Sequence, residues 1–405
     1  MMDPSHIIEV EDSRLLRTFQ RFGLVVDHAL GAYIWDASGR AYLDFMAGYG
    51  VAILGHGRRE IADAIKAQLD RNSICHGSLY SPARAEFLEE LFSVLPSNMS
   101  SAYMANSGAE AIEAAIKVAV KATGRSLLMA AKGSYHGKTL GALSITWGEK
   151  YRKPFSQLLP KVHFVDYGDL KSLESAPFEE AAALFLEPVQ GEGGVNIPSG
   201  EFMREAERRC RSSGCVFVMD EIQAGLGRTG RIWAHEHWGV RPDVITIGKG
   251  IGGGVPMGIT AMSSELSGAM RLGEQTSTFG GNPLASAAGT AVLRVLKAER
   301  LWENAEKMGS RFIQGLGRIA SSRRLAESSR GLGLMDALDL RIGVSEAIPA
   351  LISNGFISTY SGLRTLRFLP PITIGEEEVD RALSIIDKTL AEIEQAKRAA
   401  SGERD

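Results

Sequence analysis

Residues 216–258 read VFVMDEIQAGLGRTGRIWAHEHWGVRPDVITIGKGIGGGVPMG, and this stretch contains the strongest fold signal in the chain. Its first apolar run predicts a buried strand that ends in two acids, Asp220 and Glu221. A second apolar run, 244–247, is followed by Lys249, which has a glycine on each side. In an open α/β sheet the carboxyl ends of such strands form the ligand crevice. We therefore expect an acid and a partly desolvated lysine there, and desolvation favours the neutral, nucleophilic amine.

A lysine and an acid at one crevice are the two groups that pyridoxal phosphate (PLP) chemistry requires. Lys249 is placed to form a Schiff base with this cofactor, and Asp220 to keep its pyridine nitrogen protonated. The alternative is a solvated lysine in a turn and an aspartate that caps a helix. The glycines around Lys249 and the buried strand before it favour the first interpretation.

A helix start further upstream supplies a candidate phosphate site. Asn106, Ser107 and Gly108 precede a helix predicted from about 109 to 123, whose end Gly124 marks. The free backbone N–H groups and the positive dipole end of a helix N-terminus attract phosphate. Asn106 or Ser107 also suits an ordinary helix cap, and the two roles are compatible because they satisfy different donors.

Composition limits the function classes. The chain has 405 residues and a formal net charge of −3, which does not favour nucleic-acid binding. The first residues, MMDPSHIIEVEDSR, lack an apolar core, and no apolar stretch of about 18 residues predicts a membrane span. Cys75, Cys210 and Cys215 show no CxxC spacing, so neither disulfides nor a metal site are expected. We expect a cytoplasmic protein.

Near-continuous apolar strands that alternate with helices predict a mostly parallel, buried sheet. The candidate strands are 126–130, 162–167, 182–187, 216–222 and 243–248, after a hairpin at 33–36 and 42–45. The candidate helices are 59–70, 84–94, 201–212, 284–297, 301–316 and 376–398, with late strands at 332–339 and 364–369. We expect an N-terminal arm with part of the small domain (1–50), a large cofactor-binding domain (51–289) and a C-terminal small domain (290–405).

Distinctive short stretches extend over nearly the whole chain. They are YLDF (42–45), LGHG (54–57), NSGAEA (106–111), YHGKTLGALS (135–144), EPVQGEGG (187–194), MDEIQAGLGRTG (219–230), TIGKGIGGGVPMG (246–258), TSTFGGNPLA (276–285) and LRFLPP (366–371). In this order they resemble the class III (ornithine/acetylornithine type) PLP-dependent aminotransferases. The resemblance implies PLP as cofactor and an α/β protein of PLP-dependent transferase fold type I, with a mostly parallel central sheet and a smaller α/β C-terminal domain.

The resemblance also implies roles for single residues. Lys249 binds the cofactor covalently and, once freed, moves a proton as general base and acid, while Asp220 pairs with the pyridinium nitrogen. The implied cofactor contacts are Ser107, Gly108 and Ala109 at the phosphate, Tyr135 stacked on the ring, His136 packed beside the site, Glu187 close to the cofactor and Gln223 at its phenolic oxygen. The alternatives are a core tyrosine for Tyr135 and a solvated turn residue for Gln223.

Two residues far apart in the chain are implied to let one pocket accept two different kinds of substrate. In the resembling family, residues that match Glu192 and Arg367 form a switchable pair. The glutamate neutralises the arginine when an ω-amino donor binds, and releases it to hold the α-carboxylate of glutamate or 2-oxoglutarate. An ordinary surface Glu and strand-end Arg are the alternative.

Thr278 bears on the oligomeric state of the protein. Thr278 matches a threonine that reaches the phosphate of the neighbouring subunit. The resemblance therefore implies a homodimer with shared active sites.

Two positions depart from the family pattern. Lys138 stands where many relatives have an arginine that grips a distal carboxylate, and a lysine cannot make the bidentate fork. Putrescine-type enzymes also carry a lysine there, so a diamine donor stays open. Phe19 stands where ornithine-specific members have a tyrosine, which argues against free ornithine.

Three stretches, 48–57, 145–155 and 366–371, resemble a particular subgroup. These are enzymes of lysine and arginine biosynthesis whose aminoadipate or glutamate semialdehyde is tethered to an acidic carrier protein. Lys150, Arg152 and Lys153 form a basic cluster suited to such a partner, although a solvated charge run explains them equally well.

The leading hypothesis is a PLP-dependent aminotransferase that moves an amino group between glutamate/2-oxoglutarate and a terminal semialdehyde of the N-acetylornithine or carrier-linked lysine/ornithine type, in a ping-pong cycle. The alternatives are an ornithine, 4-aminobutyrate or diamine ω-aminotransferase, a glutamate-1-semialdehyde aminomutase, and a binding module without activity. Fold alone does not choose among these.

Overall fold

The computed structural model of the protein describes residues 2–401, and its centre is a seven-stranded sheet of order β4-β10-β9-β8-β7-β5-β6. Within this sheet β10 runs antiparallel to both neighbours and the other pairs are parallel. The strands are β4 (Met99–Ala105), β5 (Leu127–Ala131), β6 (Val162–Val165), β7 (Ala181–Leu186), β8 (Val216–Asp220), β9 (Val244–Ile247) and β10 (Gly258–Ser263). The predicted α/β fold with a mostly parallel sheet is confirmed.

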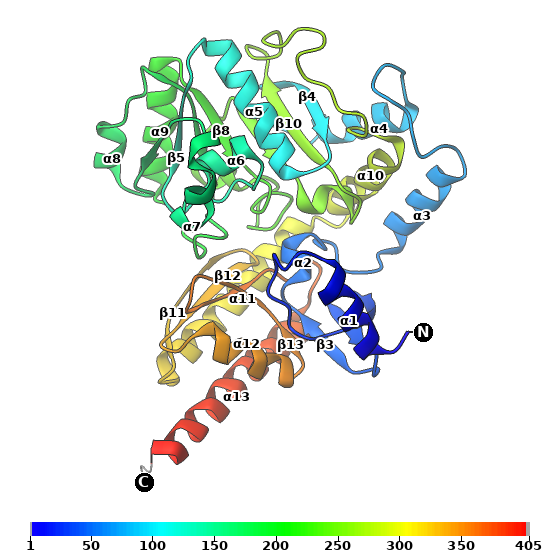
Figure 1. The fold of residues 1–405 in the computed structure, drawn as a ribbon, viewed down its shortest axis with the longest axis vertical. Helices are drawn as coiled ribbons and strands as arrows, with labels where there is room; N and C mark the ends of the chain where they lie inside the picture. The colour runs from blue at the N-terminus through cyan, green and yellow to red at the C-terminus, as the bar shows by residue number, and fades with distance from the viewer. Residues whose placement is uncertain (1, 402–405) are drawn as a thin grey trace.

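Helices cover both faces of this sheet, because side chains alternate between its faces along each buried strand (Figure 1). Val216 and Val218 of β8 join the core that contains Ile112 and Ile116, whereas Phe217 and Met219 join the core on the opposite face. The helices of this part are α3 (Arg59–Leu69), α4 (Pro82–Phe92), α5 (Gly108–Thr123), α6 (Leu140–Ile145), α7 (Glu149–Arg152), α8 (Leu170–Glu174), α9 (Gly200–Ser213) and α10 (Pro283–Ala298).

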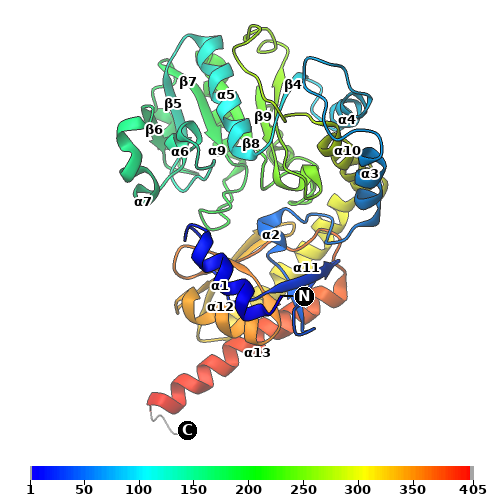
Figure 2. The ribbon, with the colours of Figure 1, turned by 45° about the vertical axis from the view of Figure 1, so that its right-hand side comes forward.

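The N-terminal and C-terminal segments lie side by side in a second, smaller body (Figures 1 and 2). They are joined by a sheet of order β1-β2-β3-β13, in which β13 pairs in parallel with β3. The N-terminal elements are α1 (Pro4–Arg14), β1 (Val26–Leu30), β2 (Tyr33–Asp36), β3 (Ala41–Asp44) and α2 (Ala47–Gly50). Those that follow α10 are α11 (Leu301–Ser322), β11 (Ala326–Leu332), β12 (Met335–Leu340), α12 (Val344–Ser353), β13 (Phe356–Ile357), β14 (Thr359–Ser361), β15 (Thr365–Phe368) and α13 (Glu376–Ser401).

The predicted strand at 332–339 is wrong in its extent. The chain turns at Gly333, whose φ is 58°, and β11 and β12 form an antiparallel hairpin on either side of it. A glycine adopts this left-handed conformation without the clash that a side chain would cause. The apolar run in the sequence therefore spans a turn. The division at residues 50 and 289 stays a prediction, and residues 402–405 of its last part lie outside the described residues.

A buried arginine connects the two bodies. Arg228, in the loop after β8, is fully buried and donates through Nη1 to the carbonyls of Leu334, at 3.0 Å, and Pro370. Burial lowers its pKa to about 9, and the nearby Asp336 charge opposes that shift. These contacts fix the loop that follows the acidic strand end against the smaller body. Across the described chain no helix combines the length and apolar character needed to cross a membrane.

Two glycines of helix α11 provide a matched test of how this helix packs on the Gly333 turn. A Cβ added at Gly309 would lie 1.8 Å from the carbonyl oxygen of Gly333, while one at Gly317 would meet only Ser329 Oγ, at 3.9 Å. We expect Gly309→Ala to lower the free energy of unfolding by about 1–3 kcal/mol through overpacking. Gly317→Ala should raise it by up to ~1 kcal/mol, since alanine favours helix. Urea unfolding measures both, and equal midpoints for the two variants would refute the proposed clash.

Candidate active site

The parallel pairing of β8 with β9 brings the predicted acid and lysine together. Asp220 is the Cα partner of Thr246, and Lys249 follows three residues later. Successive side chains of a strand point to opposite faces, so Asp220 and Glu221 at the end of β8 point in different directions. Glu221 is held away from the cavity by Ala234 N, at 2.9 Å, and by the ring of His235, at 2.8 Å. Asp220 therefore remains as the carboxylate that faces Lys249 across one cavity.

Asp220 is fixed in orientation by two buried contacts. His136 Nδ1 lies 2.7 Å from its Oδ2, and the N–H of Ile222 donates to its Oδ1 at 3.1 Å. Asp220 and His136 are both almost fully buried. Two buried contacts limit the rotation of a carboxyl group. Asp220 thus presents a carboxyl group of fixed orientation to the cavity.

Lys249 lies in a strained turn directly after β9. Its φ is 49°, a left-handed conformation that costs a residue with a side chain about 1–2 kcal/mol. Burial lowers the pKa of its amine to about 8; the Arg367 charge adds to this effect, and the charges of Glu192, Asp220 and Glu187 oppose it. The lowered pKa raises the neutral fraction of this amine near neutral pH above that of an ordinary lysine, and the neutral form is the one that acts as nucleophile or general base.

The N-terminus of α5 forms one wall of the same cavity. Ser107 caps the helix, its Oγ accepting from the N–H of Glu110 at 3.2 Å, and Gly108 packs directly on Ile222. A Cβ at Gly108 would lie 2.8 Å from Ile222, so only glycine allows this approach. The N–H groups of the first helical turn have no partner within the helix. They are available to an anion in the cavity.

Glu187 holds the opposite wall together. Its two oxygens accept from the N–H groups of Tyr135, at 2.8 Å, and Gly191, at 3.0 Å. Burial raises the pKa of this carboxyl to about 7; Asp220 also raises it, and His136 and the two hydrogen bonds oppose the shift. Glu187 thereby fixes the loop that carries Tyr135 and His136.

The predicted pair of Glu192 and Arg367 is formed. Arg367 Nη2 lies 2.5 Å from Glu192 Oε1, and Nη1 lies 3.3 Å from Gln223 Oε1. Arg367 is fully buried, whereas about a third of the Glu192 side chain is exposed. Thr359 contributes an oxygen 3.4 Å from Nη2. The arginine is held on several sides, while the glutamate side chain is partly open to solvent.

Most of the predicted residues line one cavity of about 350 Å³. They are Gly108, Ala109, Tyr135, His136, Lys138, Glu187, Glu192, Asp220, Gln223 and Lys249. Ser107 lies next to this lining as the helix cap, and Arg367 reaches it through Glu192 and Gln223. Thr278 is exposed in the loop before α10 and does not line the cavity of its own chain. Phe19 is 83% exposed and does not line it either.

Two tyrosines near the cavity, Tyr49 and Tyr151, were not predicted from the sequence. Lys138 Nζ lies 3.0 Å above the ring of Tyr151 and 5.4 Å from that of Tyr135. Burial lowers the pKa of Lys138, and the Lys150 charge adds to the effect. Tyr49 lies 5.9 Å from the guanidinium of Arg367. The left-handed φ of Tyr49, 60°, marks an unusual turn that no sequence pattern predicts.

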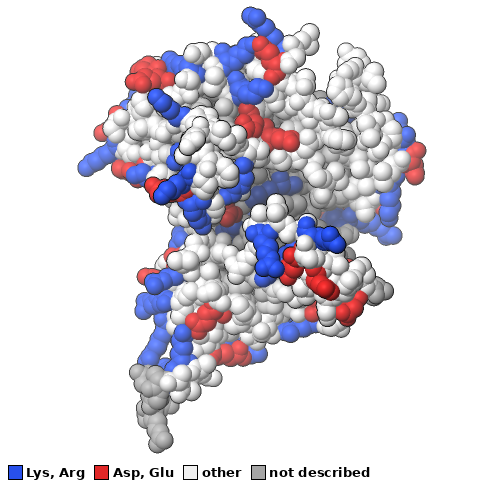
Figure 3. Space-filling view, in the orientation of Figure 1, with Lys and Arg blue, Asp and Glu red and all other residues white. Residues whose placement is uncertain are grey.

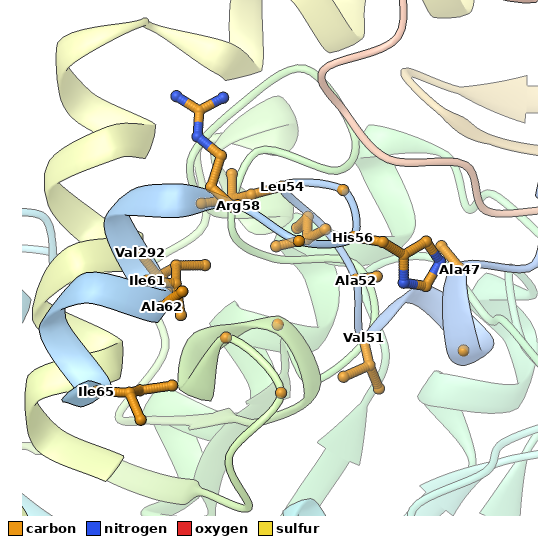
Figure 4. Close-up of a pocket in the computed structure, with 17 residues that line it drawn as sticks. Ala47, Val51, Ala52, Leu54, His56, Arg58, Ile61, Ala62, Ile65 and Val292 are labelled. Atoms are coloured by element: carbon orange, nitrogen blue, oxygen red, sulfur yellow. The ribbon is translucent and has the colours of Figure 1, made fainter. Parts of the chain in front are cut away.

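A second cavity, of about 360 Å³, lies behind the Lys249 turn (Figure 4). Ile61 and Ile65 of α3 and Val292 of α10 line it, together with the loop that carries His56. His56 Nε2 is 2.8 Å from Asp44 Oδ2. None of the predicted site residues lines this cavity, so we assign it to the packing behind the active site and not to the site itself.

The chain matches the family described as Aminotransferase class-III over residues 17–390. It is 40% identical to the LysW-aminoadipate semialdehyde transaminase of Deinococcus radiodurans, over 96% of this chain and 91% of that protein. It is 38% identical to the acetylornithine aminotransferase of Archaeoglobus fulgidus, over 94% and 99%. A solved ornithine aminotransferase from Toxoplasma gondii, with partial occupancy of PLP at its active site, superimposes with a TM-score of 0.93 at 30% identity, over 97% of this chain and 96% of that one. The predicted fold type is confirmed.

The depressed pKa of Lys249 predicts a pH-dependent effect on the stability of the cofactor-free protein. The pKa is about 8 in the fold against an ordinary value of 10.5, so folding disfavours the protonated amine. This penalty is complete below about pH 8 and disappears as the pH rises past 10.5. We expect Lys249→Met to stabilise the protein more at pH 7.5 than at pH 10.5, by thermal unfolding. The exposed Lys153→Met is the control, and an equal effect of Lys249→Met at both pH values would contradict the shift.

The cavity has the groups that PLP needs. It combines an amine with a lowered pKa, a fixed carboxylate, an aromatic side chain and a helix N-terminus made accessible by Gly108. Its volume suits a cofactor-sized ligand. No group of three or more His, Cys, Asp or Glu side chains suited to a metal occurs among residues 2–401. Together with the comparisons, this chemistry identifies the chain as a member of the class III aminotransferase family and a PLP-dependent transaminase.

Proposed function

We propose that the enzyme transfers an amino group between glutamate/2-oxoglutarate and a terminal semialdehyde whose α-amine carries an acyl group, in a ping-pong cycle. The contact between Glu192 and Arg367 carries this proposal. A fixed, buried guanidinium suits the α-carboxylate of glutamate, and a mobile carboxylate can neutralise it when the other substrate binds. The relatives named for LysW-aminoadipate semialdehyde and for acetylornithine support the N-acyl class.

The residues of the cavity have complementary proposed roles. When bound, PLP supplies an electron sink for the C–H bond that breaks at the substrate carbon bearing the transferred amine, which is Cα in glutamate and the terminal carbon in the ω-amino donor. Lys249 binds the cofactor and, in its neutral form, accepts the proton from that carbon and returns it. Asp220, oriented by His136, keeps the pyridine nitrogen protonated, and the α5 N-terminus at Ser107 and Gly108 holds the phosphate. Tyr135 stacks on the ring, and Gln223 contacts the phenolic oxygen.

We also propose a homodimer with shared active sites. Thr278 lies outside its own cavity and is exposed, as expected for a residue that serves the partner's phosphate. The loop before α4 exposes Ile74, Leu79 and Tyr80, the last of them completely. Exposed apolar side chains of this kind are typical of a subunit contact. A cytoplasmic location and an acidic carrier protein as partner remain parts of the proposal.

A free ornithine donor is the second candidate, because the fold superimposes closely on an ornithine aminotransferase. The exposed position of Phe19, away from the cavity, provides no contact that would select for or against ornithine. The donor must therefore be determined by direct comparison.

Single half-reactions test the function. PLP-loaded enzyme is mixed with one donor and no acceptor, and loss of the absorbance of the lysine-bound cofactor is followed. We expect glutamate and N-acetylornithine or a carrier-linked lysine to react, and ornithine, 4-aminobutyrate and putrescine to react at least tenfold more slowly, a difference of about 1.4 kcal/mol. Lys249→Ala should abolish the lysine-bound absorbance and turnover, and Lys153→Ala should not.

Other outcomes decide among the alternatives. Fastest reaction with putrescine or 4-aminobutyrate would replace the N-acyl assignment with a diamine or γ-amino donor. Turnover of glutamate 1-semialdehyde without any 2-oxoglutarate would indicate an aminomutase. Unchanged function in Lys249→Ala would leave only a binding module.

The Glu192 switch makes its own prediction. Glu192→Gln removes the charge that neutralises Arg367 but leaves the guanidinium free for an α-carboxylate. We expect kcat/KM for the N-acyl ω-amino donor to fall about tenfold or more, because a buried cation is left unpaired, while the glutamate half-reaction keeps its rate. Glu201→Gln, an exposed substitution in α9, is the control. Equal losses for both substrates would argue against a switch.

A further inference from the structure

A large cavity lies at the edge of the active site, between α7 and α12. Its volume is about 860 Å³, more than that of the cavity around Lys249. Its polar lining comprises Gln20, Arg21, Lys150, Ser345, Ser353, Tyr360 and Arg364, and no Asp or Glu lines it within the described chain. Figure 3 shows Lys and Arg side chains on both sides of the hollow between the two bodies. The cavity is therefore a basic one.

Two of these cations are not neutralised. Arg21 is paired with Asp12 at 2.9 Å and with Glu11 at 3.3 Å. Lys150 and Arg364, in contrast, have no acidic partner within 4 Å among residues 2–401. The nearby acid of α12, Glu346, is engaged by Lys397 at 3.0 Å. A single anion between Lys150 and Arg364 would neutralise charges that the fold leaves unpaired.

Side chains connect this cavity with the active site. The ring of Tyr151 lies between two amines, with Lys138 Nζ at 3.0 Å and Lys150 Nζ at 4.6 Å from its centroid. Lys138 lines the active-site cavity, and Lys150 lines the basic one. On the other side, Ser361 donates to the carbonyl of Glu192, next to Tyr360 of the basic cavity. The two cavities are therefore neighbours, and the ring of Tyr151 lies between the lysines that line them.

The three residues of the basic cluster inferred from sequence differ in their surroundings. The Arg152 guanidinium lies 4.6 Å from the ring centroid of Phe164 and is partly buried, which lowers its pKa. Lys153 is exposed and does not line the cavity. Only Lys150 faces it, and its partner across the cavity is Arg364, more than 200 positions later in the chain. Lys150 and Arg364 are both exposed to solvent but line one cavity, which favours an anion held in that cavity over a flat docking surface.

We propose that this basic cavity is a second substrate subsite, which binds a carboxylate at the far end of the acyl group on the amino donor. The proposal rests on the proposed function, since it concerns the α-amine substituent of that donor. Lys150 and Arg364 contact the carboxylate from opposite walls. The N-terminus of α12, a ten-residue helix that starts at the cavity without a side-chain cap, adds its positive dipole end.

Binding of unreactive analogues tests the subsite. Nα-succinyl-norvaline carries the far carboxylate and has no terminal amine to react, and Nα-succinamoyl-norvaline replaces that carboxylate with a neutral amide. Their affinities for the PLP-loaded enzyme are measured by calorimetry, in the wild type and in Lys150→Glu, Arg364→Glu and the control Lys153→Glu. We expect the succinyl compound to bind more tightly, and its affinity to fall about tenfold in the first two variants. The succinamoyl compound and the control should change less than about twofold.

Two results would overturn the subsite. One is equal affinity of the wild type for the two analogues, and the other is an equal loss for both analogues in the charge-reversal variants. The glutamate half-reaction is measured in parallel and tests the proposed function separately. An enzyme that fails to react with glutamate but discriminates between the analogues would retain the subsite and lose the transaminase assignment.

A third ligand shows whether the carboxylate belongs to a small acyl group or to a peptide. A glutamate-rich peptide joined through a carboxyl group to the norvaline nitrogen is compared with the succinyl compound. Tighter binding of the peptide, lost in Arg364→Glu, would indicate an acyl group borne by a peptide or protein. Equal binding would indicate a small acyl group. Both outcomes support a far carboxylate, and absence of binding by both compounds would exclude it.

Discussion

The active site depends on the parallel pairing of β8 with β9. Because both strands are buried and their register is fixed, Asp220 stands beside Thr246 and the chain reaches Lys249 within one turn. The same register sends Glu221 to the other side, where it fastens residues 234–235. A slip of one residue would exchange these two acids and leave the cavity without its fixed carboxylate.

Charge balance in the cavity follows from which groups are fixed. Arg367, Asp220 and His136 are buried and held by neighbours, whereas Glu192 is partly exposed. Burial and Arg367 lower the pKa of Lys249, and the surrounding carboxylates limit that shift. The charge of Glu192 thus acts on both the Arg367 guanidinium and the Lys249 amine.

Sequence patterns predicted the buried parallel strands and most long helices, because apolar periodicity reports burial directly. They missed β4 and β10, whose segments MSSAYMA and GITAMS mix small and polar residues and owe their strand form to pairing with each other. They also merged part of the β11–β12 hairpin into one strand, since nothing in the apolar run marks Gly333 as a turn.

The sequence by itself determined the chemistry of the site: a lysine and an acid after two buried strands, a capped helix start at Ser107, and the family to which these belong. The packing of the two bodies was needed to show that Glu192 meets Arg367 and that Lys150 and Arg364 line one basic cavity. Local spacing fixes which way a side chain leaves its strand or helix, whereas partners far apart in the chain meet only when the two bodies pack together.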